Sequence, residues 1–341
     1  MKLVGLFDAF LQDTVNLNAS RIAFLEQKVE AVERALRSSD YAQVLRSVAI
    51  KGSFAQQTII KPPKNRHEFD ADMVLYVREK DGWSASDYID QLYNALRAAP
   101  PYCSMVSRKT RCVTLDYEGD FHLDLVPITV RRPLLSKTTY RVCNRTIGDF
   151  EPTDGQAYEH WWNNKAEILG DDLLAETIRA LKYLRDIKGR FSCKSILLTT
   201  LIARQIQDKD RGAFSDVPTV LKVMIGRLDD FLAENPKMPR IENPVLPGED
   251  FNRHWDQKKY SNFRGQIGRY RRWIDDAYDE DDLQESVGKW RDLFGSSYAR
   301  AQDIHSPRFV STYGDESAVE ETQNGRAIVV AGLLALVAIL R

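Results

Sequence analysis

The feature that most constrains the fold is a change in hydrophobic periodicity near residue 155. Before it, short runs rich in β-branched and aromatic residues mix with helical patterns, and after it apolar residues recur at intervals of three and four. Strands collected in one part of a chain and helices in the other are typical of α+β proteins. We therefore predict an α+β fold with a sheet-containing lobe (residues 1–154), a helical lobe (155–310), a cleft between them, and a tail (311–341).

The first lobe is expected to be a mixed sheet with flanking helices. Apolar residues at three- and four-residue intervals predict a long amphipathic helix over residues 20–36, and a second helix over residues 86–98 ends before a Pro-Pro pair. The N-terminal sequence MKLVGLFDAFLQDTVNLN is expected to form an amphipathic helix rather than a secretion signal, because two aspartates interrupt it. The β-type runs cover residues 44–54, 69–77, 103–107, 112–117 and 121–130. The helices expected in the second lobe cover residues 158–169, 172–187, 193–206, 217–232 and 254–278.

The charge balance argues against a protein that coats nucleic acid. Lys and Arg number 48 against 49 Asp and Glu, for a net charge of -1, whereas nucleic-acid binding needs a clustered positive excess. No obligatory nucleic-acid activator is therefore expected. The four cysteines lie far apart and form no zinc-ligand spacing, which favours a reducing cytoplasm.

The tail contains an uninterrupted apolar run, Ala327 to Leu340. As a helix it would reach about 21 Å, short of the roughly 30 Å hydrocarbon core of a bilayer. The sequence leaves open a docked helix or protein-binding tail on one side and a shallow membrane anchor on the other.

A cluster of carboxylates is the main chemical signal. Asp70 and Asp72 are two residues apart at a strand start, so their side chains point to the same face. Asp124, within the apolar run FHLDLVPI, is the preferred third carboxylate, ahead of Asp116 and Asp120. An Asp-x-Asp pair alone is common where a turn enters a strand. Three clustered carboxylates, however, would repel one another without cations, and hard oxygen ligands favour Mg²⁺ or Mn²⁺.

A Gly-Ser pair precedes the acidic residues. Gly52 and Ser53 follow a β-type run and precede AQQTII, which is expected to form a brief helix. At such a corner, backbone N–H groups and the hydroxyl can approach phosphate oxygens. Taken by itself, however, a Gly-Ser pair is far more often a plain turn than a phosphate-binding site.

These elements, in this order, resemble the polymerase-β-like nucleotidyltransferases. The segments KGSFAQQT, EFDADMVLYV and FHLDLVPI are similar to those of the bacterial cyclic-oligonucleotide synthases related to cGAS and the oligoadenylate synthases, which are called CD-NTases. The similarity extends into the helical lobe through ALKYLRD, FSCKSILLTTLIA and ENPVLPGEDFNRHW, and covers roughly Ser20 to Phe294. It implies a nucleotidyltransferase lobe joined to a helical lobe like that of the oligoadenylate synthases.

The resemblance also implies roles for individual residues. Asp70, Asp72 and Asp124 would hold two Mg²⁺ or Mn²⁺ ions, and Gly52 and Ser53 would bind the β- and γ-phosphates of a nucleotide. The second lobe would contribute Lys182, Lys194 and Ser195 to the phosphates and Phe191 to a base. The alternatives are a solvated helix face for the two lysines and a core position for Phe191.

The function implied is the joining of ATP or other nucleoside triphosphates into a cyclic di- or trinucleotide, with release of pyrophosphate, as a second messenger in bacterial defence against phage. Two alternatives remain at this point. One is a nucleotidyltransferase that makes linear oligonucleotides or modifies RNA or protein. The other is a catalytically silent nucleotide-binding scaffold.

Overall fold

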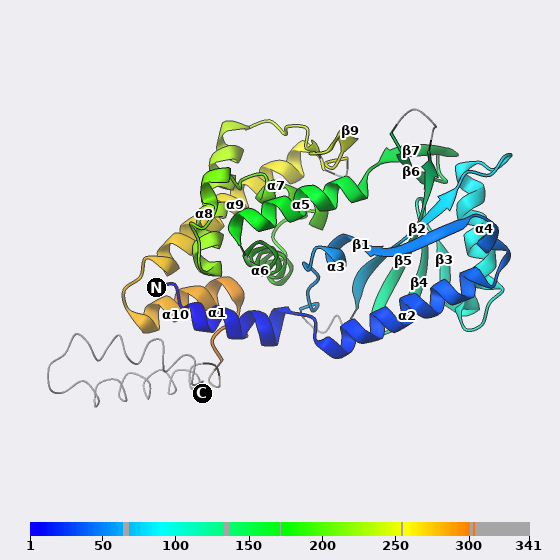
Figure 1. Ribbon diagram of the computed structural model, residues 1–341. Coiled ribbons are helices and arrows are strands. Elements are labelled where there is room, and N and C mark those ends of the chain that lie inside the picture. The colour runs from blue at the N-terminus through cyan, green and yellow to red at the C-terminus, as the bar shows by residue number, and fades with distance from the viewer. Residues whose placement is uncertain (64–67, 133–136, 171, 254, 301–302, 304–341) are drawn as a thin grey trace.

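The computed structural model describes residues 1–341 except 64–67, 133–136, 171, 254, 301–302 and 304–341. It has two lobes, one built on a mixed sheet and one helical, as expected of an α+β fold (Figure 1). In the sheet lobe the elements are α2 (Ala19–Arg37), β1 (Leu45–Lys51), α3 (Gly52–Ala55), β2 (Phe69–Arg78), α4 (Ala85–Arg97), β3 (Val106–Arg108), β4 (Val113–Tyr117), β5 (Phe121–Arg131), β6 (Thr139–Asn144) and β7 (Asp149–Thr153), with 3₁₀ turns at Asp40–Gln43 and Tyr102–Ser104.

The helical lobe contains the remaining elements. They are α5 (Gly155–Leu169), α6 (Leu173–Lys188), α7 (Ser195–Ala203), α8 (Val217–Glu234), α9 (Gln257–Tyr278) and α10 (Leu283–Phe294), a 3₁₀ turn at Asp208–Asp210, and a small hairpin of β8 (Glu242–Asn243) and β9 (Leu246–Asp250). The boundary predicted at residues 154 and 155 falls between β7 and α5.

The seven-stranded sheet has β2 and β5 at its centre. Five strands follow the order β1-β2-β5-β4-β3, and β6 and β7 branch from this order, with β6 paired to β5 and β7 paired to β6. β2 and β5 are parallel, and all other pairs in the sheet are antiparallel. The long strand β5 pairs with β4 through its first half and with β6 through its second half. The result is the mixed sheet that the sequence predicts.

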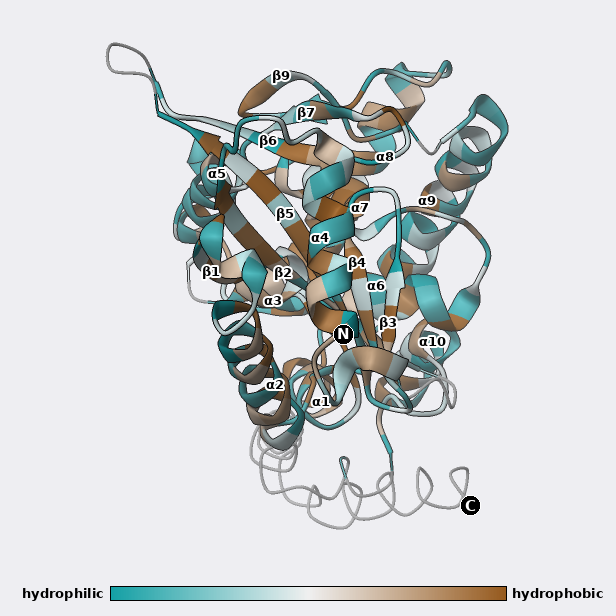
Figure 2. Ribbon diagram, turned by 90° about the vertical axis from the view of Figure 1, so that its right-hand side faces the viewer, coloured by the Kyte–Doolittle hydropathy of each residue, from teal (hydrophilic) through white to brown (hydrophobic). Residues whose placement is uncertain are grey.

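Alternation along β2 separates a core face from an open face. Phe69, Ala71 and Met73 are buried in the core that the sheet forms with α2 and α4, whereas Asp70 and Asp72 point to the other side. Figure 2 shows hydrophobic residues concentrated on β4 and β5, with mixed polar and apolar colouring on α2 and α4. The amphipathic helices thus cover one face of the sheet and leave the acidic face free for the second lobe.

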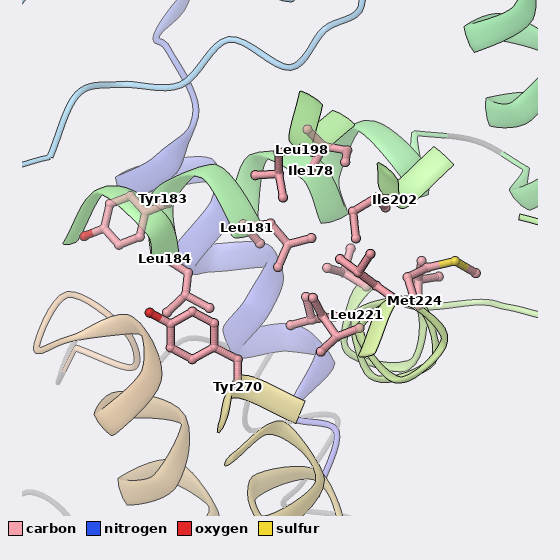
Figure 3. Packing of buried hydrophobic residues seen from close by; sticks show 14 of the residues in the cluster. Ile178, Leu181, Tyr183, Leu184, Leu198, Ile202, Leu221, Met224 and Tyr270 are labelled. Atoms are coloured by element: carbon pink, nitrogen blue, oxygen red, sulfur yellow. The ribbon is translucent and has the colours of Figure 1, made fainter. Parts of the chain in front are cut away.

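Helix α6 is the buried centre of the helical lobe. Ile178 and Leu181 of α6 pack with Leu198 of α7 and Leu221 and Met224 of α8 (Figure 3). Burying one such side chain contributes about 1.5–3 kcal/mol. This packing fixes the position of the polar residues that α6 presents to the sheet lobe.

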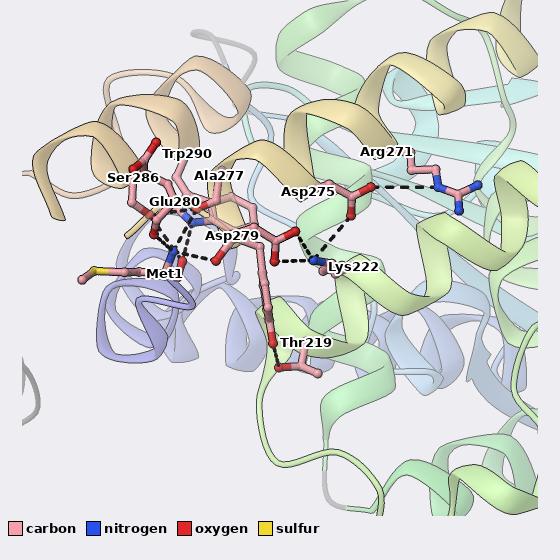
Figure 4. Close-up of polar contacts among 11 residues, drawn as sticks. Met1, Thr219, Lys222, Arg271, Asp275, Ala277, Asp279, Glu280, Ser286 and Trp290 are labelled. Atoms are coloured by element: carbon pink, nitrogen blue, oxygen red, sulfur yellow. Dashed lines mark hydrogen bonds and ion pairs between the residues drawn. The ribbon is translucent and has the colours of Figure 1, made fainter. Parts of the chain in front are cut away.

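The N-terminal segment packs with the helical lobe, although it was expected in the first one. Residues of α1 (Val4–Phe10) and of the following π-helical turn (Leu11–Val15) belong to the core of the second lobe. The Met1 ammonium donates to the carbonyls of Ala277, at 3.1 Å, and Tyr278, at 2.6 Å, near the end of α9 (Figure 4). Beside it, Lys222 of α8 pairs with Asp279 at 2.5 Å. The chain therefore crosses from the helical lobe to the sheet before α2 begins.

The predicted long helices and the strands β1, β2, β4 and β5 are confirmed to within a few residues. The first residues of the β-type run expected at 103–107 lie in a 3₁₀ turn, since β3 begins only at Val106. The strands β6 to β9 and the helix α10 were not predicted. β7 contains Pro152, and α10 contains Gly288 at its centre, both of which weaken the local signal. The expected helix in AQQTII is wrong, because Gln57 adopts a left-handed backbone, with φ 55°, that stops α3 after Ala55.

In the described part of the chain, no helix combines the length and apolarity that crossing a membrane requires. The apolar run at residues 327–340, for which a docked helix, a partner-binding tail and a membrane anchor were considered, lies outside the described residues.

Candidate active site

Two rows of polar side chains cross the open face of the sheet. In one row Asp72 of β2 is the register partner of Asp124 of β5, which is in turn the partner of Thr114 of β4. In the other row, which lies two residues closer to the starts of β2 and β5, Asp70, His122 and Asp116 are partners in the same way. The strand order therefore brings together carboxylates that lie about 50 residues apart in the sequence.

The first row is electrostatically strained. Burial, followed by the charges of Asp124 and Asp70, raises the pKa of the Asp72 carboxyl to about 6. Asp124 Oδ1 accepts a short hydrogen bond from the Thr114 hydroxyl and lies 3.5 Å from the ammonium of Lys109. Asp124 thus has a hydrogen-bond donor and a cation beside it, whereas the ionised form of Asp72 is destabilised by burial and by the neighbouring carboxylates.

Gly52 makes the close approach between α3 and the acidic row possible. Its φ is 64°, in the left-handed region, and a Cβ atom on this residue would overlap Asp72 Oδ2. A side chain at position 52 would therefore displace the carboxylate or the start of α3. The structure supplies a specific reason for glycine here, which separates it from an ordinary turn glycine.

The donor set fits a hard divalent cation, since Asp70, Asp72 and Asp124 offer oxygen ligands alone on one face. The raised pKa of Asp72 shows that this face favours added positive charge. The side chains do not yet form a closed cage, because Asp70 is 88% exposed and lies 3.4 Å from His122 Nδ1. Among the described residues, the group of metal-type ligands whose donor atoms lie within 4.8 Å of one another is Glu68, Asp116 and His122.

A cavity of about 860 Å³ opens beside this face, between the lobes. Six of the predicted site residues line it, whereas Gly52, Asp72 and Asp124 are not among its lining residues. The predicted residues in the lining are Ser53, Asp70, Lys182, Phe191, Lys194 and Ser195. The volume and the mixture of basic, hydroxyl and aromatic groups suit a nucleotide.

Lys182 is buried rather than on a solvated helix face. Its Nζ donates to the Thr58 carbonyl at 2.8 Å and to the Thr58 hydroxyl at 2.9 Å. Burial, followed by the positive charge of Arg185, lowers the pKa of Lys182 to about 7. A buried ammonium of this kind would gain from a phosphate placed in the cavity.

Lys194 and Ser195 sit at the start of α7. Lys194 was expected within a helix but precedes it, with an extended backbone, because α7 begins at Ser195. Lys194 is exposed, and Ser195 Oγ accepts a hydrogen bond from Arg185 Nη1 at 3.2 Å. Both face the cavity, in line with the predicted phosphate role.

Phe191 lies both in the core and at the cavity, the two positions considered for it. Its ring packs edge-on against Phe263, at 5.1 Å between centroids, and also lines the cavity. One part of the ring is fixed by the core and another part remains open to a ligand.

Some cavity residues were not predicted. Arg185 lies three residues after Lys182 on α6, so helical spacing could have identified it. Thr58, which also lines the cavity, and His122, which lies outside the cavity lining on the acidic face, gave no such signal. Thr58 lies in an irregular segment, and the neighbours of His122 depend on strand pairing that the sequence does not reveal.

The chain is similar to known proteins in both sequence and fold. Residues 1–166 match the family model of the Second Messenger Oligonucleotide or Dinucleotide Synthetase domain. The chain is 24% identical over 364 residues to a c-di-GMP synthase of Roseivirga ehrenbergii, with 96% of this chain and 91% of the relative covered.

Two solved structures have a similar fold. One is CdnG, a CD-NTase of Bradyrhizobium diazoefficiens, in complex with GTP, with a TM-score of 0.68, 18% identity, and 92% of this chain and 97% of that chain covered. The other is CdnC of E. coli MS115-1 with ATP, with a TM-score of 0.68, 22% identity, and 86% of this chain and 98% of that chain covered. Over residues 1–166 the chain is therefore similar to the Second Messenger Oligonucleotide or Dinucleotide Synthetase domain, and its overall fold is similar to that of the two solved structures.

Proposed function

We propose that the protein is a metal-dependent nucleotidyltransferase that joins nucleoside triphosphates through phosphodiester bonds and closes them into a cyclic di- or trinucleotide. The observation that carries this proposal is the pairing of Asp72 with Asp124 on the open face of the sheet, next to Gly52 and beside a cavity lined by Ser53 and Lys182. This arrangement combines a cation site with a phosphate site in one cleft.

Asp70, Asp72 and Asp124 would hold two divalent cations. When bound, such cations neutralise charge on the triphosphate and lower the pKa of the attacking hydroxyl. The carboxylates orient that hydroxyl against the α-phosphate, and the paired charges of Asp72 and Asp124 make the face selective for cations.

The phosphates of the donor nucleotide would lie against Gly52 and Ser53 on one side and against Lys182, Lys194 and Ser195 on the other. Lys182 and Lys194 supply positive charge, and the hydroxyls of Ser53 and Ser195 donate hydrogen bonds. Phe191 would stack on the base, a contact worth about 1–3 kcal/mol.

The relatives suggest the substrates. One is named a c-di-GMP synthase, and the two similar structures contain GTP and ATP. We therefore propose purine nucleoside triphosphates as substrates, a cytoplasmic site of action, and a second-messenger role in anti-phage defence. A protein or membrane partner for the tail remains part of the proposal.

The test is product analysis. The purified protein is incubated with all four ribonucleoside triphosphates, and separately with GTP alone and ATP alone, with Mg²⁺ or Mn²⁺. Release of pyrophosphate together with a phosphatase-resistant product whose mass fits a cyclic oligonucleotide supports the proposal. A phosphatase-sensitive product identifies a linear oligonucleotide synthase instead, and tight nucleotide binding without turnover identifies a silent scaffold.

A further inference from the structure

The loop that carries Ser53 is held from the opposite lobe. Arg179 Nη1 of α6 donates to the Gln57 carbonyl at 2.6 Å, and one turn later Lys182 Nζ donates to the Thr58 carbonyl at 2.8 Å. Arg179, Lys182 and Thr58 are all buried. Two adjacent carbonyls of the sheet lobe are thus bound by two cationic residues on one face of α6, a largely buried helix of the other lobe.

The backbone at this point is strained. Gln57 has a φ of 55°, a left-handed conformation that favours glycine. Its side chain is exposed to solvent. The conformation turns the Gln57 carbonyl toward α6, where the Arg179 guanidinium meets it. A charge-assisted bond to a buried carbonyl can offset the strain.

The strained turn is connected directly to the phosphate-binding candidates. The Thr58 amide donates to the Ser53 carbonyl at 2.8 Å, and the Gln57 amide donates to the Phe54 carbonyl at 2.9 Å. Displacement of Gln57 would therefore move α3 and Ser53. Arg179 itself is not among the residues that line the cavity, so it influences a bound nucleotide through the loop.

We propose that Arg179 is a positioning residue for the phosphate-binding loop, holding Gln57 in its left-handed conformation so that Ser53 faces the cavity. The expected effect of Arg179 on nucleotide turnover rests on the proposed function. Its structural content, a clamp between α6 and residues 53–58, stands on the hydrogen bonds and the backbone geometry alone.

Three variants test the clamp. Arg179→Met removes the donor, and Gln57→Val disfavours the left-handed backbone while leaving Arg179 and the protein core unchanged. Both single variants are expected to lower kcat/KM for nucleoside triphosphates about ten- to a hundredfold, since a displacement of about 1 Å at a phosphate site has an effect of that size. In the double variant, Gln57→Gly is expected to restore most of the activity that Arg179→Met removes, because glycine adopts the conformation without help.

The matched control is Arg204→Met, because Arg204 donates to the Glu242 carbonyl, also at 2.6 Å, within the helical lobe. It should stay within about twofold of the parent. The clamp is refuted if Arg179→Met or Gln57→Val retains the parent's kcat/KM, or if the double variant is no more active than Arg179→Met. A purely electrostatic effect of Arg179 on the nucleotide would give the latter result.

A second readout does not depend on turnover. Amide hydrogen exchange of a peptide covering residues 53–60 should become faster in Arg179→Met and Gln57→Val and return toward the parent rate in the double variant. Unchanged exchange in both single variants refutes the clamp even if the enzyme is active. A parent protein that turns over no nucleotide refutes the proposed function instead, and the exchange rates still decide the role of Arg179.

Discussion

Replacing Asp72 by asparagine should stabilise the metal-free protein while abolishing product formation. Burial and the neighbouring carboxylates raise the pKa of Asp72 from 3.8 to about 6, which corresponds to about 3 kcal/mol favouring the protonated form. Above pH 6 the folded parent carries this cost in full, because Asp72 is ionised in both the folded and the unfolded chain. Asparagine carries no charge, so Asp72→Asn should gain up to about 3 kcal/mol at pH 8.

The sign of the pH dependence follows from the same values. Between pH 3.8 and about 6 the folded parent retains a proton that the unfolded chain has lost, so the parent's free energy of unfolding falls as pH rises through this window, relative to the variant. The difference between the two proteins should be small at pH 4 and largest above pH 6. Urea unfolding in EDTA at several pH values measures it.

Asp70→Asn provides the matched control. Asp70 lies on the same strand and face, but its side chain is 88% exposed, so this variant should change stability by less than about 0.5 kcal/mol while also losing activity. Adding Mg²⁺ should stabilise the parent more than Asp72→Asn. The reasoning is refuted if Asp72→Asn is less stable than the parent in EDTA at pH 8, or if the stability difference does not vary with pH.

Further predictions follow from the same site. Gly52→Ala should lower the free energy of unfolding by about 1–2 kcal/mol and reduce kcat at least about tenfold, because its Cβ would displace the Asp72 carboxylate; urea unfolding and initial rates measure both, and parent-like values would contradict the proposed contact. Lys182 has a pKa lowered to about 7, so triphosphate binding at pH 8 should take up a proton; calorimetry in buffers of different ionisation enthalpy should detect the uptake in the parent and not in Lys182→Met. Phe191→Leu should keep the fold but weaken nucleotide binding by about 1–3 kcal/mol, whereas unchanged affinity with lower stability would assign Phe191 to the core alone.

Local patterns predicted the elements that carry the site. The alternation in FDADMVLYV and FHLDLVPI placed the aspartates on one strand face, opposite the apolar residues that pack on α2 and α4. The period of the helices in the second half identified α5 to α9. These features depend on neighbours within one element, which the sequence displays directly.

Features that depend on contacts between distant elements were not predictable. Amphipathicity showed that the N-terminal segment buries one face, but not that the face belongs to the helical lobe. The register that places Asp72 opposite Asp124 pairs strands separated by more than 40 residues. Lys182 was expected to be solvated or to face phosphates. Its burial was not predictable, because the Thr58 oxygens that accept hydrogen bonds from its ammonium belong to the other lobe.

The most direct test of the account is an anomalous difference map of crystals grown with Mn²⁺ and a nonhydrolysable nucleoside triphosphate. The account predicts Mn²⁺ peaks about 2.0–2.2 Å from carboxylate oxygens of Asp72 and Asp124, with Asp70 completing the site and the triphosphate running past Ser53. A peak at His122 with none at Asp72 and Asp124, or a triphosphate bound away from Ser53, would contradict it.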